Sequence, residues 1–231
     1  MKLVASLFIV CFVVFSAGCA FIPLSPKNEE VTDYSSLVEG SPVDGGISIL
    51  PVAVVNGKKF QEENARKDHN VLDLEFLRIA RKKFPDNTVV PIPRAAFNED
   101  AWEKYEGLVK KLSTPKDYNS KTDKKILGSL LELVQDRLDI ELGHLLVVIV
   151  NSDKNSFAES SKLDGVTAVL DLKNISLLHA TTTEHEYDSL TSVKEFYPMA
   201  VSKLIDGSVG RIKEKVSVDD EVAVSKAESD S

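Results

Sequence analysis

The segment that most constrains the fold is residues 144–150 (HLLVVIV), which carry an apolar side chain at almost every position. A strand with one face in water alternates apolar and polar residues, whereas a strand covered on both faces is apolar throughout. We therefore expect a central strand here, between two layers of helices. Residues 122–142 precede it and predict a helix that Gly143 ends, with an apolar stripe made by Leu127, Leu130, Leu131, Val134 and Leu138.

The chain from residue 47 to residue 216 fits one domain of the mixed α/β (α+β) class. Further helices are predicted after the capping residues Asn70 and Asn98, and over the last part of the domain, where Pro198 is tolerated in the first turn. The order β-α-β-α-α-β-β-β-α indicates a mixed sheet of about five strands with helices packed on it. Besides the central strand, β-branched runs predict strands at residues 47–55, 88–92, 166–172 and 175–183, the last two joined by a two-residue turn at Lys173 and Asn174.

The N-terminus has the pattern of a secretory signal peptide. Lys2 is the sole charged residue before Lys27, residues 3–16 are apolar, and two small residues precede Cys19. A basic start, an apolar core and a small-residue exit are typical of a cleaved leader. We therefore expect residues 1–18 to be a signal peptide.

The two cysteines of the chain, Cys11 and Cys19, both lie in this N-terminal region. The remainder of the chain therefore contains no disulfide and no thiolate metal site. Cys11 lies inside the apolar core of the leader, so Cys19 is the one thiol that remains after cleavage.

Residues 16–19 (SAGC) resemble the lipobox of bacterial lipoproteins, with Ser16 where an aliphatic residue is usual. In that family the cysteine is acylated, with palmitate among the acyl groups, before the leader is removed. The resemblance implies lipidation at Cys19, and two acyl chains hold a protein firmly on a membrane. Ala20 replaces the aspartate that retains enterobacterial lipoproteins at the inner membrane, which implies the outer membrane and a periplasm-facing domain.

Two alternatives to the lipid anchor remain open. Residues 3–26 carry no charge, and a bilayer is spanned by about 20 apolar residues, so the leader could stay as an uncleaved helix in the inner membrane. The other alternative is a plain secretory leader that is cleaved without lipidation.

Two segments flank the predicted domain. Residues 19–46 contain proline, serine, asparagine and a pair of glycines, and they predict a flexible tether, part of which (residues 34–38) could dock onto the domain. Residues 217–231 are acidic and lack an apolar stripe, which predicts a disordered tail.

The net charge of −8 argues against nucleic-acid binding, which needs a basic stripe, and it also argues against electrostatic adhesion to anionic lipid. His179 and His185 would share one face of a strand but stand ~20 Å apart, too far to chelate one ion. Beside the alternating Glu184 and Glu186, they predict a solvated strand end.

No other pattern in the sequence predicts catalysis. Ser208 lacks the spacing of a nucleophile elbow, and Asp164 with Gly165 reads as a turn before a strand. No phosphate-binding glycine loop, zinc-binding helix or calcium loop is present. We expect no catalytic, cofactor or metal site, and therefore no enzyme.

Three stretches give the domain a resemblance to the N-terminal domain of TolB and to CsgG-like and LpoB-like lipoproteins: residues 47–55 as the opening strand, residues 144–150 as the central strand, and the hairpin at residues 166–184. A closer resemblance is to the rhombotarget-type lipoproteins, through residues 35–38 (SSLV) and the hairpin at residues 169–178. The resemblance covers about residues 34–212. It implies a binding or scaffolding role at the cell envelope and carries over no functional residue except Cys19.

The sequence therefore leaves two functions open. A non-enzymatic lipoprotein that binds an envelope protein predicts an exposed apolar or aromatic patch. A hydrolase or small-ligand-binding lipoprotein needs instead a deep pocket that brings His179, His185 or Asp164 together with a second charged group.

Overall fold

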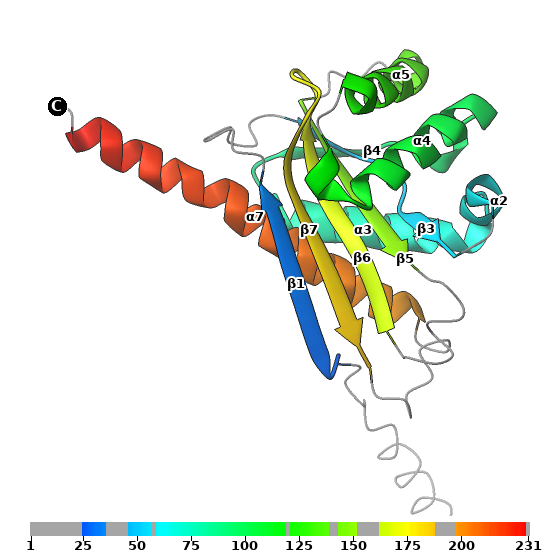
Figure 1. Ribbon diagram of the computed structural model, residues 1–231, viewed down its shortest axis with the longest axis horizontal. Coiled ribbons are helices and arrows are strands. Elements are labelled where there is room, and N and C mark those ends of the chain that lie inside the picture. The colour runs from blue at the N-terminus through cyan, green and yellow to red at the C-terminus, as the bar shows by residue number, and fades with distance from the viewer. Residues whose placement is uncertain are drawn as a thin grey trace, which may run out of the picture.

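The computed structural model describes residues 25–35, 46–56, 59–118, 121–138, 143–151, 162–187 and 197–229. Cys19 and the leader lie outside these ranges. The described residues form a seven-stranded mixed sheet with helices on both faces (Figure 1). The predicted fold class is confirmed, although the sheet has more strands than expected. None of the helices in these ranges is long and apolar enough to cross a membrane.

The strand order across the sheet is β1-β7-β6-β5-β2-β4, with β3 also paired to β5. The strands are β1 (Asn28–Ser35), β2 (Gly46–Ile49), β3 (Ala53–Val55), β4 (Thr88–Pro91), β5 (His144–Asn151), β6 (Lys162–Asp171) and β7 (Ser176–Glu186). The helices are α2 (Phe60–Asn64), α3 (Asn70–Lys83), α4 (Glu99–Leu112), α5 (Lys121–Leu138) and α7 (Tyr197–Ser229), with short 3-10 turns at Lys67–His69, Arg94–Ala96 and Pro115–Asp117.

The central position predicted for residues 144–150 is confirmed. β5 is buried along these residues, and it pairs in parallel with β2 and β3 on one side and antiparallel with β6 on the other. The strand predicted at residues 47–55 is interrupted between β2 and β3. Pro51 lies in this interruption and has no backbone N–H to donate to a neighbouring strand. Its carbonyl instead accepts a hydrogen bond of 2.5 Å from the hydroxyl of Tyr105.

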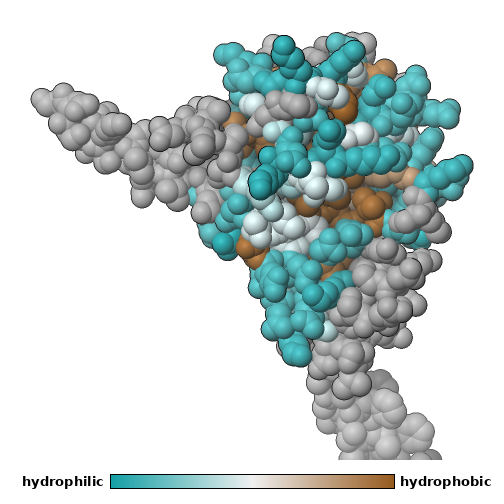
Figure 2. All heavy atoms as spheres, in the orientation of Figure 1, coloured by the Kyte–Doolittle hydropathy of each residue, from teal (hydrophilic) through white to brown (hydrophobic). Residues whose placement is uncertain are grey.

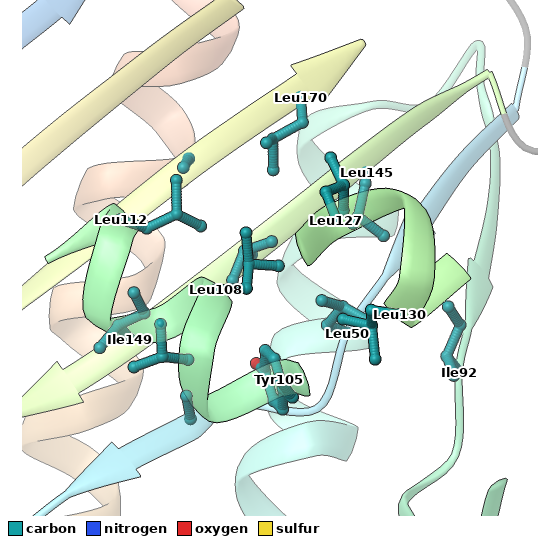
Figure 3. Packing of buried hydrophobic residues seen from close by; sticks show 14 of the residues in the cluster. Leu50, Ile92, Tyr105, Leu108, Leu112, Leu127, Leu130, Leu145, Ile149 and Leu170 are labelled. Carbon is teal, nitrogen blue, oxygen red and sulfur yellow. The ribbon is translucent and has the colours of Figure 1, made fainter. Parts of the chain in front are cut away.

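Two helix layers enclose the sheet. The α4–α5 layer packs on one face, where Tyr105, Leu108, Leu127 and other side chains meet Leu145 of the central strand (Figure 3). The α3–α7 layer packs on the other face and contributes residues such as Phe76 and Leu204 to a separate apolar cluster. The arrangement expected for a strand that is apolar on both sides is therefore present.

The helix boundaries follow the predicted signals in part. Asn98 caps α4 as expected, because its side chain accepts a hydrogen bond of 2.9 Å from the backbone N–H of Ala101. Asn70 is instead the first residue of α3, so the residue in the capping position is His69, which makes no side-chain cap. Helix α5 ends at Leu138, and residues 139–142 lie outside the described ranges.

Two segments outside the predicted domain have regular structure. Residues 28–35, expected within the flexible tether, form β1 and pair with β7 over eight residues. Residues 217–229, expected to be a disordered tail, continue α7. No glycine or proline follows Gly210, so the sequence contains no helix-breaking residue there.

The β6–β7 hairpin is longer than predicted, and β6 already includes Asp164 and Gly165, so these residues are not a turn. The connection contains four residues, 172–175, instead of two. Asp171 stabilises it by accepting hydrogen bonds from the backbone N–H of Lys173 at 2.8 Å and from the side-chain amide of Asn174 at 2.5 Å. Such side-chain bonds to a nearby backbone are a common way to stabilise turns.

Candidate docking groove and polar seam

A groove of about 500 Å³ lies between the N-terminal half of α3 and the first turns of α7. Its apolar lining comes from both helices, and three polar side chains complete it. We call it the docking groove, and its residues are Val71, Leu72, Leu74, Glu75, Arg78, Pro198, Met199 and Ser202.

The docking groove gathers the exposed large hydrophobic side chains of the described residues. Val71 is 58% exposed, Leu74 is 67% exposed and Met199 is 42% exposed. Val71 and Leu74 are three positions apart and therefore lie on one side of α3. The opposite side of this helix, with Phe76 and Ile79, is buried against the sheet. Single exposed apolar residues need no explanation, whereas a group of them in one groove marks an interaction surface.

The charges at the rim of the docking groove neutralise one another. Arg78 donates two hydrogen bonds to the carboxylate of Glu75, of 2.8 and 2.7 Å, and the Ser202 hydroxyl donates a third of 2.6 Å. These bonds from Arg78 and Ser202 lower the pKa of Glu75 to about 2. The charges at the rim are therefore balanced within the rim itself.

The opposite face of the molecule has a different surface. Figure 2 shows many hydrophilic residues on this face, with a brown patch near the middle of the view, below the position of α4 in Figure 1. The partly buried apolar residues that pack against the cluster on this side include Val55, Ile126 and Leu133.

A second feature is a row of buried polar side chains on β7 that face α7. We call it the polar seam, and it consists of His179, Thr181, Thr183 and His185, each at most 3% exposed. The two histidines do share one face of the strand, but the predicted solvated strand end is wrong. Helix α7 crosses this face and covers them, a packing that the strand sequence alone does not encode.

Carboxylates of β1 and a guanidinium of α7 complete the polar seam. Asp33 lies 3.7 Å from His179 and accepts hydrogen bonds from Thr181 at 2.9 Å and from Arg211 at 3.2 Å. Burial acts to raise the pKa of Asp33, but the bonds from Thr181 and Arg211 outweigh it and lower that pKa. The seam therefore joins the edge strand β1 to α7.

The other end of the polar seam is held less tightly. His185 Nε2 lies 3.9 Å from Glu29 Oε1, which is too long for a hydrogen bond, although the opposite charges attract when the ring is protonated. Burial lowers the pKa of His185, and the nearby Glu29 opposes this effect. The ring contacts the hydroxyl of Tyr187 at 3.4 Å. His185 is therefore favoured in its neutral form.

The polar seam does not form the deep pocket that a hydrolase needs. His179 pairs with Val169 and His185 pairs with Leu163, which places both rings on the α3–α7 side of the sheet. Asp164 follows Leu163 on β6 and therefore lies on the other face of the sheet, where burial raises its pKa. Ser208 lies in α7, and its hydroxyl is 2.7 Å from that of Thr167. Among the described residues, no group of three His, Cys, Asp or Glu side chains could hold a metal ion.

A third feature is a polar cluster that no sequence pattern predicted, and it lies where α2, α3 and the interruption between β2 and β3 meet. Arg94, 8% exposed, donates to both oxygens of Asp73 at 2.5 and 2.8 Å and to the carbonyls of Val52 and Asn64. Asp73 also accepts a bond of 2.8 Å from the Val52 backbone. These hydrogen bonds satisfy backbone groups of Val52, at the break between β2 and β3, and of Asn64. We therefore interpret the cluster as structural. Arg94 and Asp73 match no functional motif in the sequence, because each belongs to an ordinary charged loop or helix segment.

Comparison with known proteins finds no family model that matches the chain and no similar curated protein. The resemblance to TolB-like, CsgG-like and rhombotarget-type lipoproteins therefore stays a prediction.

Several solved structures are similar in outline. PelC of Paraburkholderia phytofirmans, a dodecamer, is 9% identical, with 80% of this chain and 98% of that chain covered and a TM-score of 0.45. A DUF330 protein of Xanthomonas campestris is 8% identical, with 83% and 94% covered and a TM-score of 0.36. A lipoprotein of Neisseria meningitidis is 12% identical, with 70% and 94% covered and a TM-score of 0.32. Because these TM-scores lie below 0.5, the likenesses carry no argument about function.

Proposed function

We propose that this chain is a lipoprotein of the bacterial cell outer membrane, anchored through a lipid on Cys19. Its α/β domain acts without catalysis, as a binding or scaffolding module for an envelope protein, in the manner of the TolB-like and rhombotarget-type lipoproteins that its sequence resembles. The observation that carries the binding role is the docking groove, which gathers the exposed apolar residues Val71, Leu74 and Met199.

The position of β1 supports the proposed anchor. Cys19 lies six positions before Ser25, where the described structure begins, and β1 starts three positions later. The backbone N–H of Lys27 already bonds to the carbonyl of Glu186 at 2.6 Å. A lipid on Cys19 would therefore hold the domain through a short connection to one end of its sheet.

The anchor is tested by metabolic labelling with palmitate. We expect the wild-type chain and Cys11→Ala to incorporate the label, and Cys19→Ala to lose it and leave the membrane fraction. Cys11→Ala is the matched control, because it removes the other thiol of the leader. Label that survives Cys19→Ala would contradict the anchor, and a mature chain that keeps residues 1–18 would favour the uncleaved helix.

The binding role is tested by placing a photo-cross-linking amino acid at Leu74 in living cells. We expect a discrete protein adduct there, because this side chain is exposed in the groove. The matched control is the same amino acid at Glu103, whose side chain is 76% exposed on α4, outside the groove. Absence of a protein adduct at Leu74, or an identical adduct at both positions, would contradict the proposal.

A further inference from the structure

We infer that the segment occupying the docking groove is an apolar helix of a membrane-embedded protein, bound close to the lipid surface. This inference rests on the proposed function, since it uses the lipid on Cys19 and a protein partner in the groove. It adds the class of partner and the place of binding.

The docking groove lies at the end of the sheet where the chain enters from Cys19. Helix α7 runs in the same direction as β1, because Gly207 lies near Glu29 and Arg211 lies near Asp33 further along both elements. The first turn of α7 therefore lies toward the end of the sheet at which β1 starts, near the lower end of β6 in Figure 1. Met199 belongs to this turn, so the groove and the entering chain are at the same end of the domain.

The connection to the lipid is short. Cys19 and Ser25 are six positions apart, and a fully extended chain of that length spans at most ~20 Å. The end of the sheet that carries the groove is consequently the end nearest the membrane. A partner that reaches the groove must present its binding segment in this narrow zone, as a protein embedded in the same membrane does.

The shape and chemistry of the groove fit a helix. Two helices line it, and a third helix can pack between them by placing apolar side chains at i, i+3 or i+4, and i+7 against Val71, Leu74 and Met199. Glu75 and Arg78 already pair with each other at the rim. A charged segment in the groove would therefore find no unpaired opposite charge among the lining residues. The groove therefore favours an apolar segment over a charged one.

The lipid bilayer itself fits the groove less well. Peripheral membrane surfaces combine apolar anchors with Lys or Arg that attract anionic lipids. Here the chain has a net charge of −8, and the one cation that lines the groove, Arg78, is paired with Glu75.

The test uses the full lipidated chain with a photo-cross-linker at Leu74 and two tether lengths. One form keeps the native tether, and the other carries about 20 extra Gly/Ser residues between Pro23 and Leu24. The insertion leaves the groove unchanged but lets the domain leave the lipid zone. We expect the yield of the protein adduct to fall by about an order of magnitude, because the effective concentration decreases with the length of the connection.

Controls confirm that the insertion acts through distance. Palmitate labelling and the thermal midpoint of unfolding should be the same for both forms, since neither Cys19 nor the folded domain is altered. The partner identified in the adduct should, when it is not cross-linked, stay with the membranes after alkaline carbonate washing, and it should contain a membrane-spanning segment.

The outcomes separate this inference from the proposed function. An adduct whose yield is independent of tether length, or whose partner is released by carbonate, overturns the inference and leaves a protein-binding lipoprotein. An adduct to lipid alone, or to residues 188–196 of the same chain, also overturns it. Absence of any protein adduct with the native tether contradicts the proposed function itself.

Discussion

The two helix layers of this domain differ in what they bury and in what they expose. The α4–α5 layer closes over a group of aromatic rings, Phe60, Phe97, Trp102 and Tyr105, whose centroids lie 4.7 to 6.2 Å apart. The α3–α7 layer instead buries the polar seam and leaves the docking groove open. The α4–α5 layer buries its large aromatic residues, whereas the α3–α7 layer buries polar residues and exposes Val71, Leu74 and Met199.

The difference indicates that the α4–α5 layer contributes mainly to stability and that the groove of the α3–α7 layer does not. Buried aromatic and aliphatic side chains contribute stability in proportion to the apolar area that they remove from water. An exposed apolar groove contributes nothing of that kind until a partner covers it. We therefore expect substitutions in the α4–α5 layer to change stability, and substitutions in the docking groove to change binding.

The largest expected effect comes from truncation in the α4–α5 layer. Leu108 is fully buried, so Leu108→Ala should lower the free energy of unfolding by about 2–5 kcal/mol through lost apolar contact and the cavity left behind. Urea denaturation measures this change. Leu74→Ala is the matched control, because it removes the same atoms from an exposed site. Equal losses in the two variants would contradict the division between the layers.

The next effect is steric and lies where α7 crosses β6. A Cβ atom on Gly165 would meet the carbonyl oxygen of Ile149 at 2.6 Å and a methyl group of Leu204 at 2.9 Å. Gly165→Ala should therefore destabilise the fold by about 1–3 kcal/mol, as forced overpacking does.

Gly207 provides the control for this substitution. A Cβ atom there meets no atom closer than 4.0 Å, so Gly207→Ala should stabilise α7 by up to ~1 kcal/mol through its helix propensity. Thermal unfolding of both variants distinguishes the signs. A stabilising Gly165→Ala would mean that α7 does not approach the sheet closely.

A smaller effect depends on pH and concerns the polar seam. Burial lowers the pKa of His185 below its usual value of 6.5, so the unfolded chain binds the proton more readily than the folded chain does. Stability contributed by this site is present above about pH 6.5 and is lost as the pH falls below that value. His185→Gln, which cannot titrate, should therefore lose less stability between pH 7 and pH 5 than the wild type.

A second variant sharpens the pH comparison. Glu29 opposes the lowered pKa of His185, so Glu29→Gln should make the loss of stability at acidic pH steeper. Chemical denaturation at pH 7 and at pH 5 measures both variants. A weaker pH dependence in Glu29→Gln would contradict the attraction between Glu29 and protonated His185.

The smallest effect on stability is expected in the docking groove. Met199→Gln should change the free energy of unfolding by no more than about 0.5 kcal/mol, because the side chain is already 42% exposed. The same substitution should reduce the yield of the adduct formed from Leu74. Unchanged cross-linking beside unchanged stability would remove Met199 from the binding surface.

The elements that could be predicted from the sequence are those with a local signal. Strand β5 was recognisable because its own residues are apolar on both faces, and α4 because Asn98 caps it ahead of residues at helical spacing. Strand β1 has few apolar residues, and its partner lies at the other end of the chain, so no local pattern marks it.

The docking groove and the polar seam were missed for a related reason. Val71 and Leu74 look like ordinary core residues of an amphipathic helix, and their exposure depends on where α7 begins. His185 looked solvent-exposed because Glu184 and Glu186 flank it, and its burial depends on a helix that crosses the strand. In both regions the contact between distant segments decides the environment, which residue periodicity does not encode.

The pairing of β1 with β7 has a consequence for how the domain folds. Asn28 and Glu186, which are joined by a hydrogen bond, are separated by 158 positions in the chain. Strand β1 is therefore synthesised early and stays unpaired while most of the domain is still being made, because its partner strand comes late in the chain. Contacts of such separation form slowly and leave strand edges open to aggregation in the meantime. The carboxylates of Glu29 and Asp33 would keep this early edge soluble during the delay.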